Sequence, residues 1–169
     1  LPSRIEFENG HVISYLYDAD GIKLRTTHII GSDTTVTDYC GNVIYENGIP
    51  VKLLTEAGYV TLADSKYHYF VQDHLGNNRV VVDQSGNVEE VNHYYPFGGL
   101  LSSSVSNAVQ PYKYNGKELD RKNGLDWYDY GARMYDAALG RWHAVDPMSE
   151  KYYSISSYVY GLNTPHNCI

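Results

Sequence analysis

The sequence predicts a mainly β protein built from repeated antiparallel hairpins, with a turn-rich C-terminal part and at most short helices. Three observations lead to this fold class. The 169 residues include 18 tyrosines but only 3 phenylalanines and 2 tryptophans, and aromatic residues of this kind favour pleated strands. Fifteen glycines indicate many turns. Finally, no amphipathic pattern of helical period extends beyond about three turns.

The first predicted elements are hairpins whose turns share the pattern Asp-x-x-Gly. Aspartate can accept hydrogen bonds from the backbone of its own turn, and glycine adopts positive φ without steric cost. Extended, apolar-rich segments such as residues 12–17 and 67–71 flank these turns. A repeated hairpin cannot bury its face alone, so we expect the hairpins to stack on one another. The predicted turn residues are Asp18, Gly21, Asp38, Gly41, Asp73, Gly76, Asp83 and Gly86.

From Pro96 onwards the pattern changes. Residues 96–99, Pro-Phe-Gly-Gly, end the preceding strand, and residues 102–107 form a loop of small residues. Residues 112–114 resume an extended segment, which the hairpin signal Asn115-Gly116 closes. Further along the chain we expect one strand over 125–135, a turn over 136–140 and an extended segment over 141–145. Two later segments, 149–153 and 158–162, suit either a short helix or a strand.

Composition excludes several classes of protein. A net charge of −7 disfavours a nucleic-acid binder, which needs a basic surface to neutralise phosphates. No apolar run is long enough for a transmembrane helix, and no signal peptide begins the chain. Because the first residue is Leu1 rather than methionine, we expect a fragment or a processed product. Cys40 and Cys168 decide neither a disulfide nor a redox compartment.

Residues with catalytic or metal-binding chemistry are present, but their spacing is not that of a site. An aspartyl protease needs two carboxyl groups that share a proton, and the available aspartates are interpreted as turn and surface residues: Asp126, Asp129, Asp136 and Asp146. The histidines near Asp73, namely His68, His74 and His93, are interpreted as solvent-facing, since zinc needs three or four converging ligands. No signature of a thiol nucleophile surrounds either cysteine. The sequence therefore predicts no catalytic, metal or cofactor site.

The motifs of this chain, taken in order, resemble a known family. Residues 17–21, Tyr-Asp-Ala-Asp-Gly, resemble YD repeats. The later motifs resemble the core domain associated with Rhs repeats, in a version similar to that of Bacteroidetes. These are residues 73–79 (DHLGNNR), 94–98 (YYPFG), 114–118 (YNGKE), 124–125 (GL), 131–133 (GAR), 135–136 (YD), 140–142 (GRW), 146–147 (DP) and 163–165 (NTP). The resemblance divides the chain into degenerate YD-repeat hairpins, 1–66, and the Rhs-associated core domain, 67–169.

The resemblance implies a hollow shell. In this family, hairpins wind into a spiral sheet, the core domain plugs one end, and a variable C-terminal segment, often a toxin, is held inside. In many members the core is an aspartyl autoprotease whose Asp-Pro-x-Gly motif follows the Asn-x-Pro element. Here the sequence stops at Ile169, before that motif, and Asp146-Pro147 is a different, upstream element. We therefore expect no enzyme activity from this chain.

Several aromatic and charged residues are candidates for the plug: Trp127, Arg133, Tyr135, Arg141, Trp142, Asp146 and Pro147. Guanidinium groups stack on aromatic rings and pair with carboxylates. We therefore expect Arg133 and Arg141 to be partly buried, paired with Glu118 or Asp146. The alternative is that both arginines line the shell's interior and touch enclosed cargo.

The favoured hypothesis is a structural module that closes an Rhs-type shell around a toxin or effector segment, in competition between bacteria. Its partners would be the remainder of the shell or the C-terminal toxin segment, and an exported, secreted or cell-surface location is expected. Unpaired strand edges at the N-terminal side predict self-association. The alternatives are a glycan-binding or adhesive surface module, since sugars stack on aromatic rings, and a truncated remnant that folds without cargo.

Overall fold

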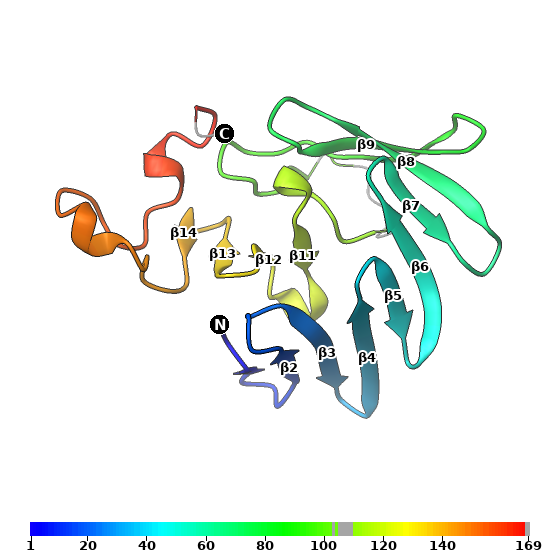
Figure 1. Ribbon diagram of the computed structural model, residues 1–169, viewed down its shortest axis with the longest axis horizontal. Helices are drawn as coiled ribbons and strands as arrows, with labels where there is room; N and C mark the ends of the chain where they lie inside the picture. The colour runs from blue at the N-terminus through cyan, green and yellow to red at the C-terminus, as the bar shows by residue number, and fades with distance from the viewer. Residues whose placement is uncertain (103, 105–109, 168–169) are drawn as a thin grey trace. The chain divides into compact units, whose positions relative to one another are not determined.

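A computed structural model describes residues 1–102, 104 and 110–167 of the chain (Figure 1). The chain divides into two compact units. Unit 1 comprises Leu1–Phe70 and Val81–Val88, and unit 2 comprises Val71–Val80 and Glu89–Ile169. The boundary expected between residues 66 and 67, which would separate the YD-repeat hairpins from the core domain, remains a prediction.

The first sheet has ten strands, and their order in the sheet is their order in the chain. Adjacent strands from β1 to β8 pair antiparallel, so each forms a hairpin with the next. This succession confirms the predicted fold class. The strands are β1 (Arg4–Glu6), β2 (Val12–Tyr17), β3 (Lys23–Ile30), β4 (Asp33–Cys40), β5 (Val43–Glu46), β6 (Ile49–Thr55), β7 (Gly58–Thr61), β8 (Lys66–Gln72), β9 (Asn78–Asp83) and β10 (Val88–Val91).

The second sheet lies within unit 2 and has four short antiparallel strands, again in chain order. These are β11 (Glu118–Asp120), β12 (Trp127–Asp129), β13 (Met134–Asp136) and β14 (Arg141–Trp142). The helical elements among the described residues are single 3₁₀ turns: η1 (Tyr114–Gly116), η2 (Lys122–Gly124), η3 (Ser149–Lys151) and η4 (Gly161–Asn163). Of the two segments that suited either helix or strand, 149–153 contains η3, whereas 158–162 only overlaps η4 and includes Val159, which forms an isolated bridge with Arg141.

Three of the Asp-x-x-Gly turns share one hydrogen-bond pattern. In each, the aspartate Oδ1 accepts from the backbone N–H groups two and four residues later. Asp73 accepts from Leu75 and Asn77 at 3.0 and 3.1 Å. The turn at Asp18 and the turn at Asp83 repeat this with distances of 2.8 to 2.9 Å. The glycines have φ between +75° and +85°, which explains why glycine occupies that position.

Asp38 departs from this pattern, so its predicted role as a turn residue is wrong, whereas Gly41 does lie in a turn, with φ of +62°. Asp38 lies inside β4, directly opposite Arg25 of β3, and its Oδ1 is 2.5 Å from the Arg25 Nε. The last pair of the hairpin joins Cys40 to Val43, which leaves only residues 41–42 for the turn. A two-residue Gly-Asn loop closes the hairpin without help from an upstream carboxylate.

The single strand expected over residues 125–135 is also wrong. The chain turns back between β12 and β13, where the Gly131 N–H donates to Asp129 Oδ1 at 2.7 Å and Gly131 has φ of +83°. Over 141–145 only Arg141 and Trp142 are strand. The turn at Asn115-Gly116 has positive φ at both residues, as the Asn-Gly pair predicts. Most of the predicted loop at 102–107 lies outside the described residues.

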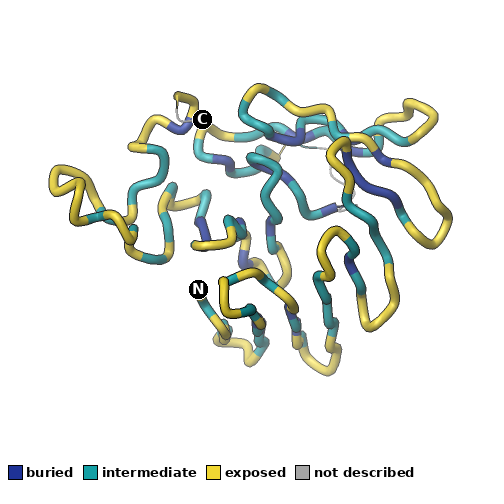
Figure 2. The backbone as a smooth tube through the Cα atoms, viewed as in Figure 1, coloured by how far each residue is buried: buried dark blue, intermediate teal, exposed yellow. Residues whose placement is uncertain are grey.

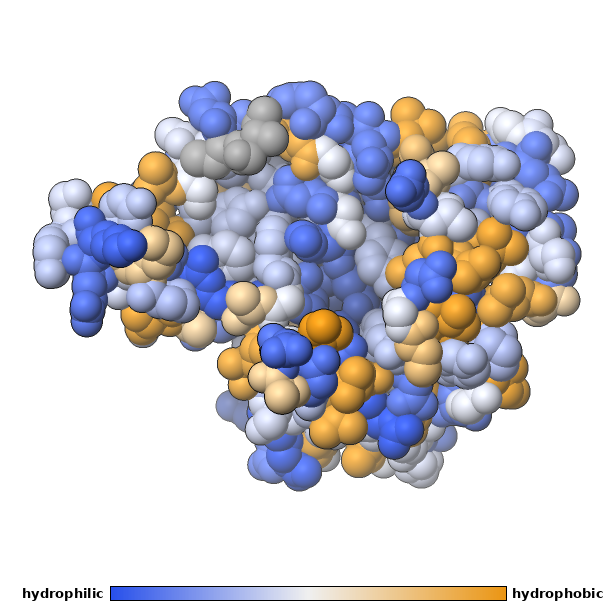
Figure 3. All heavy atoms as spheres, viewed as in Figure 1, coloured by the Kyte–Doolittle hydropathy of each residue, from blue (hydrophilic) through white to orange (hydrophobic). Residues whose placement is uncertain are grey.

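Burial in unit 1 alternates along the strands, as expected for a sheet with one covered face. Ile13 and Tyr15 of β2 are buried, as are Thr26 and His28 of β3. Figure 2 shows that buried stretches along the chain are short and separated by intermediate and exposed ones. Figure 3 shows apolar side chains gathered over β6 and β7. His68 was expected to face solvent, but it is buried, with its ring stacked on Tyr59 at a centroid distance of 4.4 Å.

Candidate functional site

The core of unit 2 is an aromatic cluster that joins its four-stranded sheet to the surrounding turns. We call it the tyrosine cluster: Tyr114, Tyr128, Tyr130, Tyr135, Trp142 and Tyr160. Neighbouring rings lie 4.1 to 6.4 Å apart between centroids, mostly tilted or edge-to-face. Such arrangements add to the free energy of simple area burial. Ring packing alone does not explain why this chain uses tyrosine instead of phenylalanine. The hydrogen bonds of the hydroxyl groups do.

Three of these hydroxyl groups hold one turn. Tyr114 donates to the carbonyl of Pro96 at 3.1 Å, and Tyr135 donates to the carbonyl of Phe97 at 2.7 Å. Tyr128 donates to the next carbonyl, that of Gly98, at 2.9 Å. Three consecutive carbonyl groups of the 96–99 turn therefore each receive a different phenol. Buried carbonyl groups of a loop need such partners, and phenylalanine could not supply them.

Two further hydroxyl groups meet at Asn115. The Asn115 Oδ1 accepts from Tyr130 at 2.6 Å and from Tyr160 at 2.8 Å. The same side chain donates from Nδ2 to the carbonyl of Leu75 at 2.9 Å, and its backbone N–H donates to Asn77 Oδ1 at 2.8 Å. Asn115 thus ties the tyrosine cluster to the Asp73 turn through bonds that span 15 to 45 residues of sequence.

The cluster is built to keep its phenols neutral. Burial raises the pKa of Tyr128, Tyr130 and Tyr135 well above the ordinary value of 10.0, and the same holds for Tyr114. A neutral phenol remains a hydrogen-bond donor, which the carbonyl contacts require. The arrangement therefore provides rigid connections, and it supplies no phenolate base near neutral pH.

The two predicted plug arginines differ. Arg133 lies with its guanidinium 4.2 Å from the centre of the Trp142 ring and with Nη1 3.1 Å from Asp146 Oδ2. Hydrogen bonding from the Met148 N–H and the charge of Arg133 lower the pKa of Asp146. Arg141 is exposed instead of partly buried, and it donates to Ser156 Oγ at 3.3 Å.

The remaining candidates have local roles. Trp127 packs on the ring of His143 at 3.5 Å between centroids, and Pro147 is exposed. Asp126 pairs with Arg121 at 2.9 Å, while Asp129 and Asp136 accept backbone N–H bonds in their own turns. Over residues 1–102, 104 and 110–167, no three His, Cys, Asp or Glu side chains gather as a metal ion would need. Cys40 is an exposed free thiol, and Cys168 lies outside the described residues.

Comparison with known proteins identifies the family. The model of the teneurin YD-shell family matches residues 52–164. The chain belongs to the teneurin YD-shell family. The matched YD-shell region contains both the tyrosine cluster and the 96–99 turn, so the cluster is part of the family's domain. This membership agrees with the Rhs and YD-repeat resemblance drawn from the motifs.

Curated relatives include surface and toxin proteins. Salivary gland surface protein 1 of Aedes aegypti is 31% identical over 96% of this YD-shell chain, which spans 5% of that protein. Toxin subunit YenC1 of Yersinia entomophaga is 30% identical over 66% of the chain and 13% of the subunit. Toxin subunit YenC2 of the same organism is 40% identical over 39% of the chain and 7% of the subunit. The YD-shell chain thus spans a small part of these relatives.

Solved structures share the fold. A crystal structure of TcdB2-TccC3-TEV superposes with a TM-score of 0.77 at 18% identity, covering 97% of the YD-shell chain and 9% of that structure's chain. A Photorhabdus luminescens Tc holotoxin pore gives 0.73 at 19% identity, covering all of this chain and 10% of the other. In the described part of the YD-shell chain, no helix has the length and apolar character needed to cross a membrane.

Sequence reasoning missed the polar residues that organise unit 2. Asn115 was interpreted only as a turn residue, and its side-chain contacts have no local sequence signal. Glu90 and Lys113 are both buried and paired, although a charged residue within a short strand usually faces water. The one available signal was the alternation in β10, which places Glu90 on the covered side of its strand.

Proposed function

We propose that this chain is a structural, non-catalytic part of a YD-repeat shell that encloses a toxin or effector segment. The observation that carries the proposal is the uninterrupted order of antiparallel hairpins from β1 to β10 in a chain of the YD-shell family. Stacked hairpins make a continuous wall, because every inner strand finds partners on both sides. Similarity to two toxin subunits supports a toxin-related setting.

In this proposal the tyrosine cluster belongs to the plug that closes the shell. Its contacts fix a turn and a small sheet in one arrangement, as a plug needs. The exported or cell-surface location and the role in competition between bacteria belong to the same proposal. The partners would be the remainder of the shell and the enclosed segment.

Limited proteolysis tests enclosure. The polypeptide in which this sequence occurs would be purified and digested in buffer and in mild urea, with fragments identified by mass spectrometry. Enclosure predicts that the segment beyond residue 169 resists digestion until the shell opens. Equal digestion of that segment in both conditions, or electron micrographs without a hollow particle, would overturn the proposal.

A second candidate function is glycan binding, and one observation favours it. Tyr67 and Tyr69 of β8 are 50% and 42% exposed, and their rings lie 6.4 Å apart with an angle of 16° between the planes. Two nearly parallel, stacked and exposed rings offer aromatic faces against which a sugar ring could pack. Glycan-array binding that is lost in Tyr67→Ala and Tyr69→Ala but kept in Tyr153→Ala would support this function, and absence of binding would exclude it.

Self-association through strand edges remains a prediction, and the outer strand of the first sheet argues against it. The outer edge belongs to β1, which has only three residues and carries an Arg4–Glu6 ion pair. Short, charged edge strands discourage pairing with other chains. Sedimentation velocity at increasing concentration would separate a monomer from an edge-paired dimer.

A further inference from the structure

Unit 2 contains a fully buried ion pair that the proposed wall function does not require. The Glu90 side chain of β10 is 0% exposed and the Lys113 side chain is 3% exposed, and Lys113 Nζ lies 2.5 Å from Glu90 Oε1. Removing two charges from water costs several kcal/mol per ion. An arrangement this costly calls for a specific reason.

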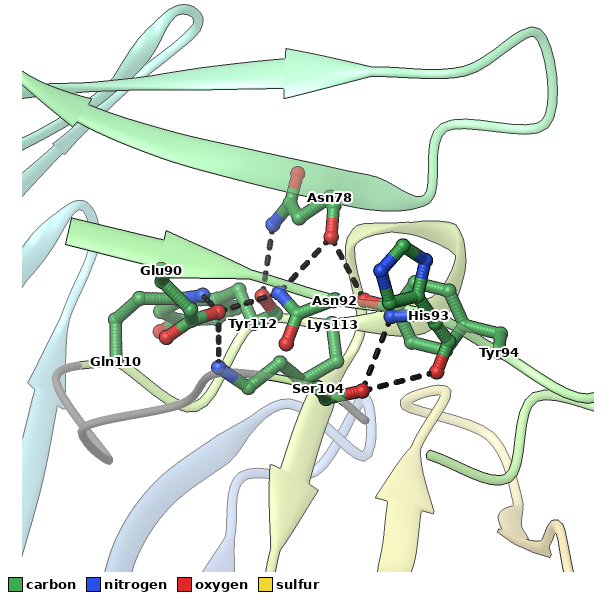
Figure 4. A network of polar contacts seen from close by, with 9 residues as sticks. All are labelled: Asn78, Glu90, Asn92, His93, Tyr94, Ser104, Gln110, Tyr112 and Lys113. Atoms are coloured by element: carbon green, nitrogen blue, oxygen red, sulfur yellow. Dashed lines mark hydrogen bonds and ion pairs between the residues drawn. The ribbon is translucent and has the colours of Figure 1, made fainter. Parts of the chain in front are cut away.

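Figure 4 shows that nitrogen atoms converge on one oxygen of this carboxylate. Besides Lys113 Nζ, Glu90 Oε1 accepts from Gln110 Nε2 at 3.0 Å and is in close contact with Asn92 Nδ2. Asn92 is itself 0% exposed, and a second bond from its Nδ2 to the Asn78 carbonyl, 3.0 Å long, fixes its amide. An amine, a carboxylate and a carboxamide therefore share one buried site.

The remaining polar atoms of this site are unsatisfied. Among the described residues, Glu90 Oε2, Asn92 Oδ1 and Gln110 Oε1 are buried without a hydrogen-bond partner. A network that served only to stabilise the fold would distribute its donors over both carboxylate oxygens. Concentration of every donor on Oε1 brings the amine and the carboxamide to the same atom instead.

We propose that Lys113 and Asn92 form an intramolecular amide cross-link, with Glu90 carrying the proton between them. Attack of a lysine amine on a carboxamide forms one C–N bond, breaks another and releases ammonia, so it needs no oxidant or cofactor. Lys113 and Asn92 both contact Glu90 Oε1 before reaction, and such prior positioning supplies much of the activation entropy. Exclusion of water prevents the competing hydrolysis of the amide.

The step conserves atoms and protons. Glu90 accepts one proton from the Lys113 ammonium, and the neutral Nζ attacks Asn92 Cγ. The bond from Cγ to Nδ2 then breaks. Nδ2 takes one proton from Nζ and one from Glu90, and it leaves as ammonium. Glu90 returns to its starting state and meets the requirement that a general base lie within hydrogen-bond distance of the atoms it serves.

Asn92 is the acyl partner favoured by the geometry, and Gln110 is the competitor. Glu90 and Asn92 are two residues apart in an extended segment, so their side chains lie on the same side. Both side chains are completely buried. The link would join the segment at β10 to the segment that enters η1, and it would make this part of unit 2 resistant to unfolding.

Mass spectrometry of the polypeptide that contains this sequence decides the proposal. The expected intact mass is lower than the sequence mass by one ammonia, and digestion should yield a branched peptide joining Lys113 to Asn92. A mass equal to the sequence mass overturns the proposal, and a branched peptide through Gln110 overturns its assignment to Asn92. This measurement needs no variant, so poor folding of a mutant cannot obscure it.

Variants then test the roles of Lys113 and Glu90 in the cross-link. Lys113→Met removes the amine, and Glu90→Gln removes the proton carrier while keeping the shape of the side chain. Both should restore the full sequence mass. The control Lys117→Met changes a lysine four residues away that lies over the Tyr130 ring, and it should retain the loss of ammonia. Retention of that loss in Lys113→Met would contradict the proposal.

Discussion

The hydroxyl of Tyr135 donates a 2.7 Å hydrogen bond to the carbonyl of Phe97, which lies 38 residues earlier in the chain. This bond is the middle one of three that hold consecutive carbonyl groups of the 96–99 turn. Tyr135 is completely buried at the centre of β13, so the turn is anchored to the core of unit 2 and not to its surface. The stability of unit 2 should therefore depend on this bond and on its neighbours.

Replacement of Tyr135 by phenylalanine isolates the hydroxyl group. The ring would keep its packing, but the Phe97 carbonyl would lose its donor, at a cost of about 1–2 kcal/mol in the free energy of unfolding. Urea denaturation followed by circular dichroism measures this loss. Tyr153→Phe is the control because Tyr153 is 91% exposed, and it should change the midpoint little. Equal midpoints for the two variants would show that the bond contributes nothing.

Gly98 should tolerate no side chain. A Cβ at this position would lie 2.6 Å from Cδ1 of the Tyr114 ring, and Gly98 has φ of +88°. Gly131 is a matched control in the same unit, since it has φ of +83° but a Cβ there would meet no atom within 4 Å. Gly131→Ala should lose about 1 kcal/mol from backbone strain alone. Gly98→Ala should lose a further ~1–3 kcal/mol from overpacking.

Thermal unfolding of both alanine variants distinguishes these contributions. A loss for Gly98→Ala no larger than that for Gly131→Ala would show that the Tyr114 ring moves away freely. In that case the 96–99 turn would not be held tightly by the tyrosine cluster.

The sequence could predict those turns whose hydrogen bonds join residues close together in the chain. The Asp-x-x-Gly turns at Asp18, Asp73 and Asp83 depend on residues within five positions. The prediction was wrong for Asp38, because a shorter Gly-Asn loop forms the turn there. Apart from the contact between Glu90 and Asn92, the side-chain contacts of Asn115 and Glu90 span 15 to 45 residues. No local pattern specifies such partners, because they depend on how the strands fold back.

Arg133 should resist replacement by lysine more than Arg141 does. Lysine at position 133 would keep a charge near Asp146 but lose the flat guanidinium that lies 4.2 Å from the Trp142 ring centre. We expect Arg133→Lys to lose about 1 kcal/mol of stability. Arg141→Lys, at an exposed position, should fall within about 0.5 kcal/mol of the unaltered chain. Urea midpoints measure both, and a larger loss for Arg141→Lys would contradict the assignment.

Acid should weaken the Asp-x-x-Gly turns. Burial of Asp73 opposes ionisation, but hydrogen bonds from Asn77 and Leu75 outweigh it and lower the pKa of Asp73 below the ordinary 3.8. Bonds from the Asn87 side chain and backbone likewise lower the pKa of Asp83. Because the folded pKa lies below the unfolded one, this stability is present above pH 3.8 and is lost as the pH falls through the folded values.

The double variant Asp73→Asn, Asp83→Asn tests this acid dependence. Asparagine still accepts backbone hydrogen bonds but does not titrate, so unfolding free energy should depend less on pH below about 4 than in the unaltered chain. Urea titrations at a series of acidic pH values provide the measurement. An unchanged slope of stability against pH would show that other carboxylates dominate the acid response.

Alkaline pH should unfold unit 2 by ionising its tyrosines. Burial raises the pKa of Tyr128 and Tyr135 above 10.0 in the folded chain. The stability that follows is fully present below pH 10.0 and is lost as the pH rises towards the folded values. Tyrosinate absorbance and circular dichroism, recorded together during a titration with base, should show the cluster tyrosines ionising in the same cooperative step as unfolding. Tyr128→Phe should reduce the absorbance of that step. Complete ionisation of all tyrosines with the circular dichroism of the folded chain intact would refute the cluster's role.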